Sequence, residues 1–252
     1  MAQSTRPPGA PASVLRVPRT STVDLIAIEL RNAIFSGALA VGSQIGEVEI
    51  SSQLGVSRSP LREATQRLVQ EGLLIATPGR GLRVSKIGPE HVKDLYVARL
   101  AVESEALRII IRRDDAEAIT LLDTQFATLV TVSEGTDARA IGNEDIAFHQ
   151  TLVDAAGSRR LSHYMSTLII ETRIASFSAP DGYAVRRSVS PTYRDLLDAL
   201  HERNVDAAVA ALSVQFDDAV SRLIGDDAEV ETVETPPDDV PPSFEPIDAP
   251  RP

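Results

Sequence analysis

Apolar residues recur every three or four positions through most of the chain between residues 88 and 224. Leu161, Met165 and Leu168 show this spacing, which places side chains on one face of a helix. Ser190 before Pro191 is a helix start signal, and Gly157 separates two helices. The pattern therefore predicts six helices. Their expected spans are 89–112, 115–134, 142–156, 158–176, 191–203 and 206–223, with the longest break over 177–188.

A shorter unit precedes these helices. Its first helix carries an apolar stripe, can be capped by Thr22 and ends at Gly37. A later start signal places Ser59 as the cap of another helix and Pro60 at its first helical position. The helices expected in this unit run from residue 22 to 37, from 47 to 54 and from 59 to 71.

Two short apolar runs follow, over residues 73–77 and 82–84, around Gly79 and Gly81. Such runs around a glycine-rich tip predict a two-stranded hairpin. A short helix, a glycine turn at Gly55, a second helix and a hairpin together make a winged helix-turn-helix.

The two ends of the chain lack the apolar content needed to fold. Residues 1–18 contain four prolines, and residues 225–252 contain seven prolines and nine acidic residues. Both composition patterns favour disorder. The predicted organisation is a disordered arm over 1–18, a winged helix-turn-helix domain over 19–87, an all-α helical bundle over 88–224 and a disordered acidic, proline-rich tail over 225–252.

The composition supports a mostly α fold, because the chain is 43% hydrophobic but only 4% aromatic. With no cysteine, disulfides, zinc ribbons and thiol nucleophiles are excluded. No apolar run approaches the roughly 18 residues that cross a membrane, and residues 1–20 have no apolar signal core. A cytoplasmic protein without a membrane partner is expected. No G-x-S-x-G motif is present either, so a hydrolase with a serine nucleophile is not expected.

The net charge of −11 is distributed unevenly along the chain. Residues 1–87 hold 10 basic and 6 acidic residues, residues 88–224 hold 14 and 21, and residues 225–252 hold 1 and 9. Salt screens charges over about 10 Å, so a basic surface on one domain acts locally whatever the total charge. The negative total therefore does not exclude a nucleic-acid partner.

The helix that begins near Ser59 carries the chemistry that DNA recognition needs. Arg58 and Arg62 are four residues apart around its start, and such a helix enters the major groove with its N-terminal end. An arginine fork matches guanine O6 and N7, and a good bidentate pair gives about 1–3 kcal/mol of discrimination. An ordinary solvated helix with surface arginines is the alternative. The candidate DNA-contacting residues are Ser57, Arg58, Ser59, Arg62, Arg67, Gly79, Arg80 and Arg83.

These motifs resemble the N-terminal domain of GntR-family bacterial transcription regulators. The resemblance covers residues 21–87 and is carried by Ile34-Phe35-Ser36-Gly37, Leu54-Gly55-Val56-Ser57-Arg58-Ser59-Pro60-Leu61-Arg62-Glu63-Ala64 and Glu71-Gly72-Leu73. It implies that Arg58, Ser59 and Arg62 contact a groove or phosphates, and that Gly79 touches DNA from the wing. Some members place another arginine early in the short helix, where this chain reads Gly46-Glu47-Val48-Glu49.

The second half resembles the FCD effector domain of the FadR-type branch, through Leu95, Arg99, Glu103 and the run Asp145-Ile146-Ala147-Phe148-His149. Many such domains bind a metal through an aspartate, a histidine four residues on and two later histidines. The resemblance places Asp145 and His149 at the first two positions, but Tyr193 and Gln215 at the last two. Tyrosine and glutamine replace imidazole poorly on a transition metal. We therefore expect no bound metal or other cofactor.

Two interpretations of these residues remain open. Asp145 with His149, and Arg99 with Glu103, could each be a simple i,i+4 pair within the bundle. Alternatively, they line a polar cavity that holds a small molecule, which the resemblance implies is a metabolite and often a carboxylate. The candidate effector-binding residues are Arg99, Asp145, His149, Tyr193 and Gln215.

The expected function is that of a homodimeric bacterial transcription regulator, a repressor, that binds double-stranded operator DNA with an inverted repeat. A small molecule in the helical domain would modulate it. The alternatives are a regulator that needs no small molecule, a metal-binding regulator, and a metal-dependent or pocket-based enzyme.

Overall fold

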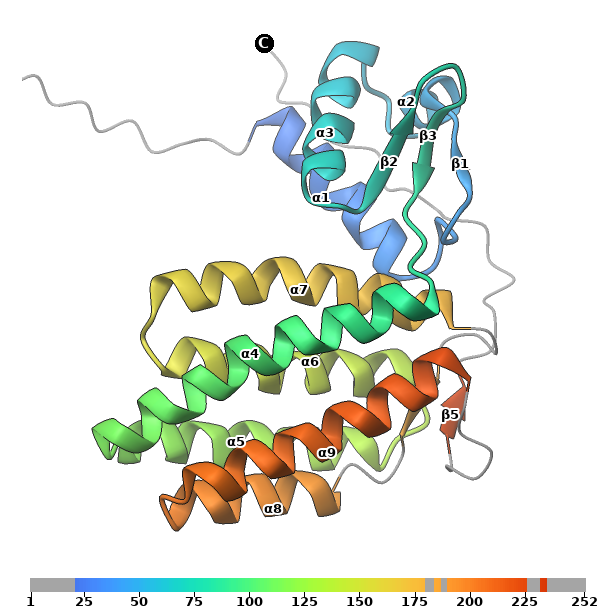
Figure 1. Ribbon diagram of the computed structural model, residues 1–252. Helices are drawn as coiled ribbons and strands as arrows, with labels where there is room; N and C mark the ends of the chain where they lie inside the picture. The colour runs from blue at the N-terminus through green and yellow to red at the C-terminus, as the bar shows by residue number, and fades with distance from the viewer. Residues whose placement is uncertain (1–20, 180–183, 187–189, 226–231, 235–252) are drawn as a thin grey trace, which may run out of the picture.

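The computed structural model describes residues 21–179, 184–186, 190–225 and 232–234. A small head with helices and a sheet sits above a bundle of long helices, as Figure 1 shows. This arrangement confirms the mostly α fold with an N-terminal winged helix-turn-helix. The arm predicted over residues 1–18 lies outside the described residues, as do residues 226–231 and 235–252 of the predicted tail.

Three helices form the head: α1 (Thr22–Phe35), α2 (Glu47–Gln53) and α3 (Arg58–Gln70). Two predicted caps are wrong by one or two residues. Ser21 caps α1, because its hydroxyl accepts from the Asp24 N–H while the Asp24 carboxylate accepts from the Ser21 N–H. Ser57 precedes α3, since its backbone is extended, whereas Ser59 and Pro60 are already helical. Pro60 is tolerated there because N–H groups of a first turn have no intrahelical partner.

A three-stranded antiparallel sheet completes the head, in the order β1 (Gln44–Ile45), β3 (Gly81–Val84) and β2 (Leu74–Thr77). Strands β2 and β3 confirm the predicted hairpin, with Thr77 opposite Gly81. Gly79 and Gly81 have φ of 73° and 79°, values that glycine adopts without the strain of a Cβ. Strand β1 was missed.

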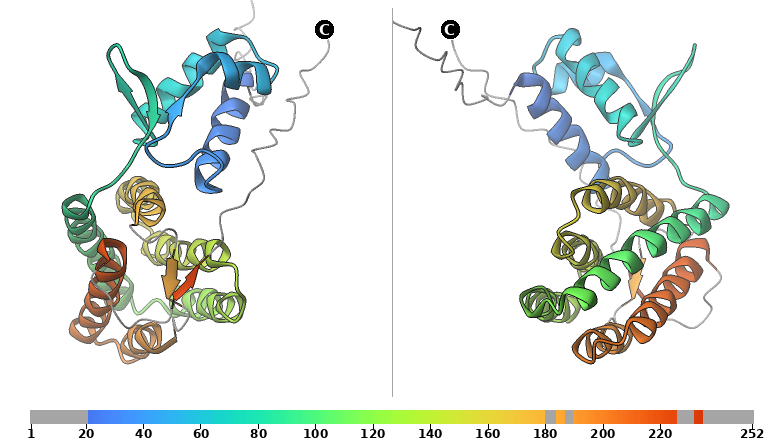
Figure 2. Two further views of the ribbon diagram at one scale, coloured as in Figure 1. Left: turned by 90° about the vertical axis from the view of Figure 1, so that its right-hand side faces the viewer. Right: turned by 60° about the vertical axis from the view of Figure 1, so that its left-hand side comes forward.

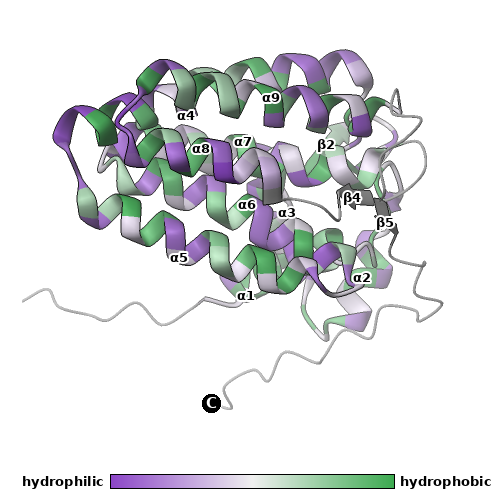
Figure 3. Cartoon of the chain, turned by 90° about the horizontal axis from the view of Figure 1, so that it is seen from below, coloured by the Kyte–Doolittle hydropathy of each residue, from purple (hydrophilic) through white to green (hydrophobic). Residues whose placement is uncertain are grey.

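The bundle contains the six predicted helices: α4 (Pro89–Arg113), α5 (Ala116–Ser133), α6 (Ala138–Ala155), α7 (Arg159–Ser178), α8 (Ser190–His201) and α9 (Val205–Ile224). The largest difference is at α6, which begins four residues earlier than predicted. The Asp137 side chain accepts from the N–H groups of Arg139 and Ala140 and so caps the helix there. Hydrophobic and hydrophilic residues are interspersed along these helices (Figure 3). Among the described residues, no helix is long and apolar enough to span a membrane.

A second, two-stranded ribbon corrects the sequence prediction at two places. Strand β4 (Ala184–Arg186) lies in the predicted loop over 177–188, and β5 (Thr232–Glu234) lies in the tail predicted to be disordered. They pair antiparallel, with Val185 opposite Val233. Backbone pairing between segments almost 50 residues apart leaves no local periodic signal that could have revealed it.

Candidate nucleic-acid interface and buried polar cavity

The N-terminal end of α3 presents polar side chains to solvent. Ser57, Arg58, Ser59 and Arg62 are all exposed, and the Ser57 hydroxyl makes no capping bond. The apolar face of the same helix, including Leu61 and Leu68, is fully buried against the head core. The helix is therefore held by one face while its polar N-terminal end is available to a ligand.

Arg62 is oriented by a neighbour on α2. Its Nε donates to Glu47 Oε2 across 3.0 Å, while its side chain remains 63% exposed. An exposed pair of this kind stabilises the fold little. Because Glu47 engages Nε, the terminal nitrogens of the guanidinium can extend beyond it.

The hairpin holds two further exposed arginines beside the glycine turn. The Gln44 amide donates to the Arg80 carbonyl across 3.2 Å. Arg83 Nη1 donates to the Gly42 carbonyl, also across 3.2 Å. These bonds link the hairpin to the segment around β1.

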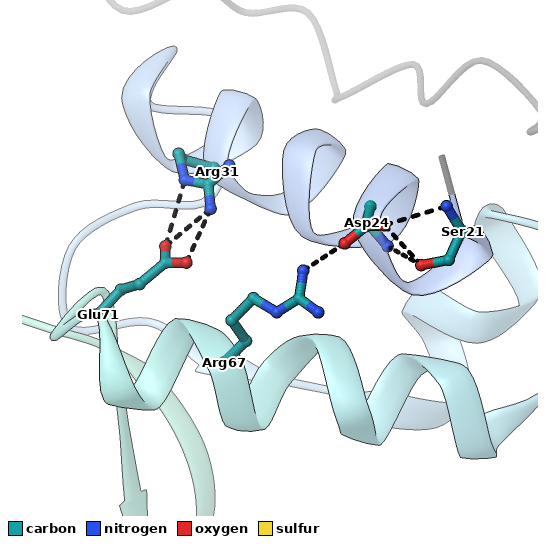
Figure 4. A network of polar contacts seen from close by, with 5 residues as sticks. All are labelled: Ser21, Asp24, Arg31, Arg67 and Glu71. Carbon is teal, nitrogen blue, oxygen red and sulfur yellow. Dashed lines mark hydrogen bonds and ion pairs between the residues drawn. The ribbon is translucent and has the colours of Figure 1, made fainter. Parts of the chain in front are cut away.

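Arg67 differs from the other predicted DNA-contacting residues. Its Nη1 donates to Asp24 Oδ1 across 2.5 Å, so its guanidinium is directed at α1 (Figure 4). The hydrogen bonds from Arg67 and from Ser21 lower the pKa of Asp24 to about 2. Arg31 on α1 and Glu71 form a second pair between the two elements, at 2.8 Å. These pairs join α1 to α3 and position the recognition helix.

In the bundle, all five predicted effector-binding residues line one cavity of about 60 Å³. Helices α4, α6, α8 and α9 bring Arg99, the pair Asp145 and His149, Tyr193 and Gln215 to it. The structure thus brings together residues that are more than 100 positions apart in sequence. The Arg99–Glu103 pair of the first interpretation is present, whereas Asp145 and His149 each bond to Tyr193.

A chain of hydrogen bonds runs across the cavity wall. Arg99 Nε donates to Glu103 Oε1 across 2.9 Å, and the other oxygen of Glu103 accepts from His149 Nδ1 across 2.6 Å. His149 Nε2 lies 3.1 Å from the Tyr193 hydroxyl, which donates to Asp145 Oδ1 across 2.5 Å. Glu103 is fully buried, and its two partners supply the hydrogen bonds that a buried carboxylate requires.

Burial and these charges affect the cavity's ionisable groups. Burial raises the pKa of Tyr193 well above its usual value, and the neighbouring Asp145 raises it further. Burial alone would lower the pKa of Arg99, but Glu103 and the other anionic neighbours outweigh it and raise the pKa. Tyr193 is therefore a neutral hydrogen-bond donor and Arg99 a permanent cation.

As arranged, these side chains do not fit the metal ion that the resemblance implies for many relatives. The Tyr193 hydroxyl contacts both Asp145 and His149, the two residues that could ligate an ion. The Gln215 amide nitrogen donates to the Thr192 carbonyl across 2.8 Å. The described part of the chain contains no group of three or more histidine, cysteine or acidic side chains placed to hold a metal.

Three buried polar atoms at the cavity have no hydrogen-bond partner among the described residues: Arg99 Nη2, Gln215 Oε1 and Arg222 Nε. Buried polar groups are rarely left unpaired, since each costs about 1–3 kcal/mol. The sequence prediction missed Arg222. It lies seven residues after Gln215 on α9, two turns along the same helix face, and that spacing could have found it.

The arginine-bearing head and the separate polar cavity define the class of protein, a DNA-binding transcription regulator with a ligand-binding domain. The family model described as bacterial regulatory proteins, gntR family, matches residues 22–84, and the FCD domain model matches residues 94–217. The chain belongs to the GntR family of bacterial transcription regulators and carries an FCD domain, so its family is one of regulators and not of enzymes.

Individual relatives support this assignment. An HTH-type transcriptional regulator of Agrobacterium vitis is 34% identical over 130 residues, which cover 50% of this chain and 76% of the relative. The probable D-xylose utilization operon transcriptional repressor of Paenarthrobacter nicotinovorans is 27% identical over 80% of this chain and 88% of its own. A GntR-type structure from Rhodococcus sp. RHA1 is 28% identical, with a TM-score of 0.62, over 81% of this chain and 97% of that one.

Proposed function

We propose that this regulator binds an inverted-repeat operator as a homodimer and represses transcription until a small metabolite enters the cavity of the FCD domain. The exposed N-terminal end of α3 carries the DNA-binding part of the proposal. A two-fold protein favours a two-fold operator, because each subunit then offers the same recognition helix to one half-site. The D-xylose repressor among the relatives supports repression as the direction of control.

In this proposal Arg58 and Arg62 enter the major groove, while Ser57 and Ser59 bind phosphates beside them. Arg80, Arg83 and Gly79 of the wing approach the neighbouring groove. Arg67 remains a predicted contact from the sequence, but its pairing with Asp24 favours a positioning role. All of these residues, Arg67 included, are exposed, as DNA contact requires.

The experiment is selection of a duplex from a random pool by the purified chain, followed by affinity measurements on variants. Arg58→Ala is expected to weaken binding of the selected duplex by about 1–3 kcal/mol, the value of one bidentate base contact. Arg160→Ala, an exposed arginine of the bundle, is the matched control and should bind as the unchanged chain does. Equal affinity of Arg58→Ala and the unchanged chain would refute the groove contact.

The unpaired atoms of the cavity support the proposal that the effector is a small anion, bound without a metal. Arg99 Nη2 and Arg222 Nε offer cationic donors, and Gln215 Oε1 offers an acceptor. A carboxylate that also carries a hydroxyl would satisfy both kinds of atom. Thermal stabilisation by glycolate, with acetate and ethylene glycol as analogues that each lack one group, tests this. Stabilisation should be largest for glycolate, and in Gln215→Leu it should fall to the level given by acetate.

The volume of the cavity favours a second candidate, a regulator that uses no small molecule. About 60 Å³ is well below the 300–1,000 Å³ of typical ligand pockets and suits a few waters. In that case no member of a metabolite panel would raise the melting temperature, while selection of a duplex would still succeed.

A further inference from the structure

Helix α7 lies between the cavity and the DNA-binding head. It is the bundle helix that runs beneath the head in Figures 1 and 2. Thr172 and Ser176, four residues apart, line the cavity. The residues that directly follow them, Arg173 and Phe177, lie against Phe35 and Gly37 of the head. Consecutive residues of a helix point about 100° apart. One helix therefore presents one face to the cavity and a neighbouring face to the head.

The contacts between α7 and the head are close. The Arg173 guanidinium lies over the ring of Phe35, the last residue of α1, with Cζ 4.9 Å from the ring centroid. A Cβ at Gly37 would lie 3.7 Å from Phe177 and 3.1 Å from Arg139 Nη2. The end of α1 thus packs directly against the bundle.

The linker between the domains meets the same end of α7. The Ile87 N–H donates to the Ser178 hydroxyl across 3.2 Å. Because Ile87 is buried and lies two residues before the start of α4, this bond fixes the point at which the head joins the bundle. A shift of the C-terminal end of α7 would therefore move both α1 and the linker.

Arg173 also bonds to α6, a helix that lines the cavity. Its Nη1 donates to Asn143 Oδ1 across 2.7 Å. Asn143 follows Gly142 on α6 and precedes Asp145 by two residues, and both of these line the cavity. A single guanidinium thus connects a head residue, Phe35, with the helix that carries Asp145.

The hydroxyls of α7 supply a way for the cavity to change this helix. Thr172 Oγ1 donates to the Leu168 carbonyl across 2.8 Å, and Ser176 Oγ donates to the Thr172 carbonyl across 3.0 Å. Such bonds to the carbonyl four residues back often bend a helix. An anion in the cavity that accepts from either hydroxyl would remove that bond to the carbonyl and so change the local geometry of the helix.

We propose that the C-terminal part of α7, residues 172–178, couples the cavity to the DNA-binding head, and that Arg173 is the positioning residue that carries the coupling to Phe35. The inference rests on the proposed function, because coupling has meaning only if the head binds DNA. It also implies the reverse effect, since coupling between two sites is reciprocal. DNA bound at the head must change the environment of α7 and of the cavity wall.

The reverse effect can be tested without knowing the effector. Amide hydrogen exchange is measured on the full chain, free and bound to the duplex that it selects from a random pool. Exchange within residues 168–178 and 141–149 is expected to change by about fivefold or more on binding, the lower end of typical coupling. Arg173→Ala should still bind the duplex but abolish that change. Arg160→Ala, on the same helix but exposed, should retain it.

If Arg173→Ala does not fold, Phe35→Leu removes the same contact through the residue on the head. It should likewise abolish the change in hydrogen exchange. If a duplex is selected but exchange in α7 does not respond to it, the coupling proposal is wrong while the proposed function stands. If the response persists in both variants, Arg173 and Phe35 do not carry the coupling. If no duplex is selected, the proposed function itself fails, and this inference fails with it.

Discussion

The Tyr193 hydroxyl donates to Asp145 Oδ1 across 2.5 Å and lies within 3.1 Å of His149 Nε2. One neutral side chain thus takes the position from which a metal ion would contact both residues. The hydroxyl gives the carboxylate one of the hydrogen bonds that its burial requires. This relationship supports the proposal that the cavity binds its effector without a metal.

Restoring imidazole at the two substituted positions should create a metal site. The double variant Tyr193→His with Gln215→His would present one carboxylate and three imidazoles, a set suited to zinc or nickel. Elemental analysis after dialysis should find about one metal ion per chain in the double variant and none in the unchanged protein. A stoichiometric metal in the unchanged protein would show that Tyr193 moves aside, contrary to the proposal.

Glu47 is expected to act on DNA specificity through Arg62. Glu47→Gln removes the 3.0 Å partner of Arg62, so the guanidinium loses its orientation and affinity for the selected duplex should fall by about 1 kcal/mol or less. Affinity for unrelated duplex should rise, because a negative charge near the phosphates is lost. Glu49→Gln removes the same charge from the exposed side of the same helix. It should raise affinity for both duplexes, as measured by fluorescence anisotropy.

Asp24 should contribute stability that depends on pH. Its pKa is lowered from 3.8 to about 2, chiefly by the hydrogen bond from Arg67. A depressed pKa in the folded state means that the contribution is complete above the unfolded value and is lost as pH falls from about 4 toward 2. Asp24→Asn should therefore melt at a lower temperature than the unchanged chain at pH 6, with the difference shrinking below pH 4. A difference that is constant from pH 6 to pH 3 would show that the charge of Asp24 does not matter.

Truncation after Gly225 tests the ribbon that the sequence did not predict. Loss of β5 removes three paired residues, and so short a strand adds little to global stability. The melting temperature should change by only a few degrees. Hydrogen exchange at Ala184–Arg186 should nevertheless accelerate, because those residues lose their backbone partner. Unchanged exchange would indicate that β4 does not depend on β5.

Regular helices were predictable because their signal is local. The apolar spacing around Met165 reflects one buried helix face, and that face is visible in the sequence whatever it packs against. Helix ends were less predictable. Asp137 and Ser57 are the N-cap residues of α6 and α3, because the backbone is extended at both. Neighbouring residues, including Ser59, offered equally plausible caps in the sequence.

The cavity residues were predictable in type but not in their connections. Arg99 could be paired with Glu103 from their spacing alone, and the structure shows that pair. Nothing in the spacing indicated that the second oxygen of Glu103 meets His149, 46 residues away. Nor did it indicate that Tyr193 bonds to Asp145. Such contacts depend on how separate helices pack.

Motif and spacing alone were sufficient to establish a winged helix-turn-helix followed by a helical domain, and to point to Arg58 and Arg62, because recognition chemistry is encoded within one short helix. Only the three-dimensional fold shows which arginines pair with distant residues. Arg67 pairs with Asp24, 43 residues away, and Arg62 pairs with Glu47, 15 residues away. Ion pairs form wherever folding brings opposite charges together, and neither partner reveals the other in the linear order of residues.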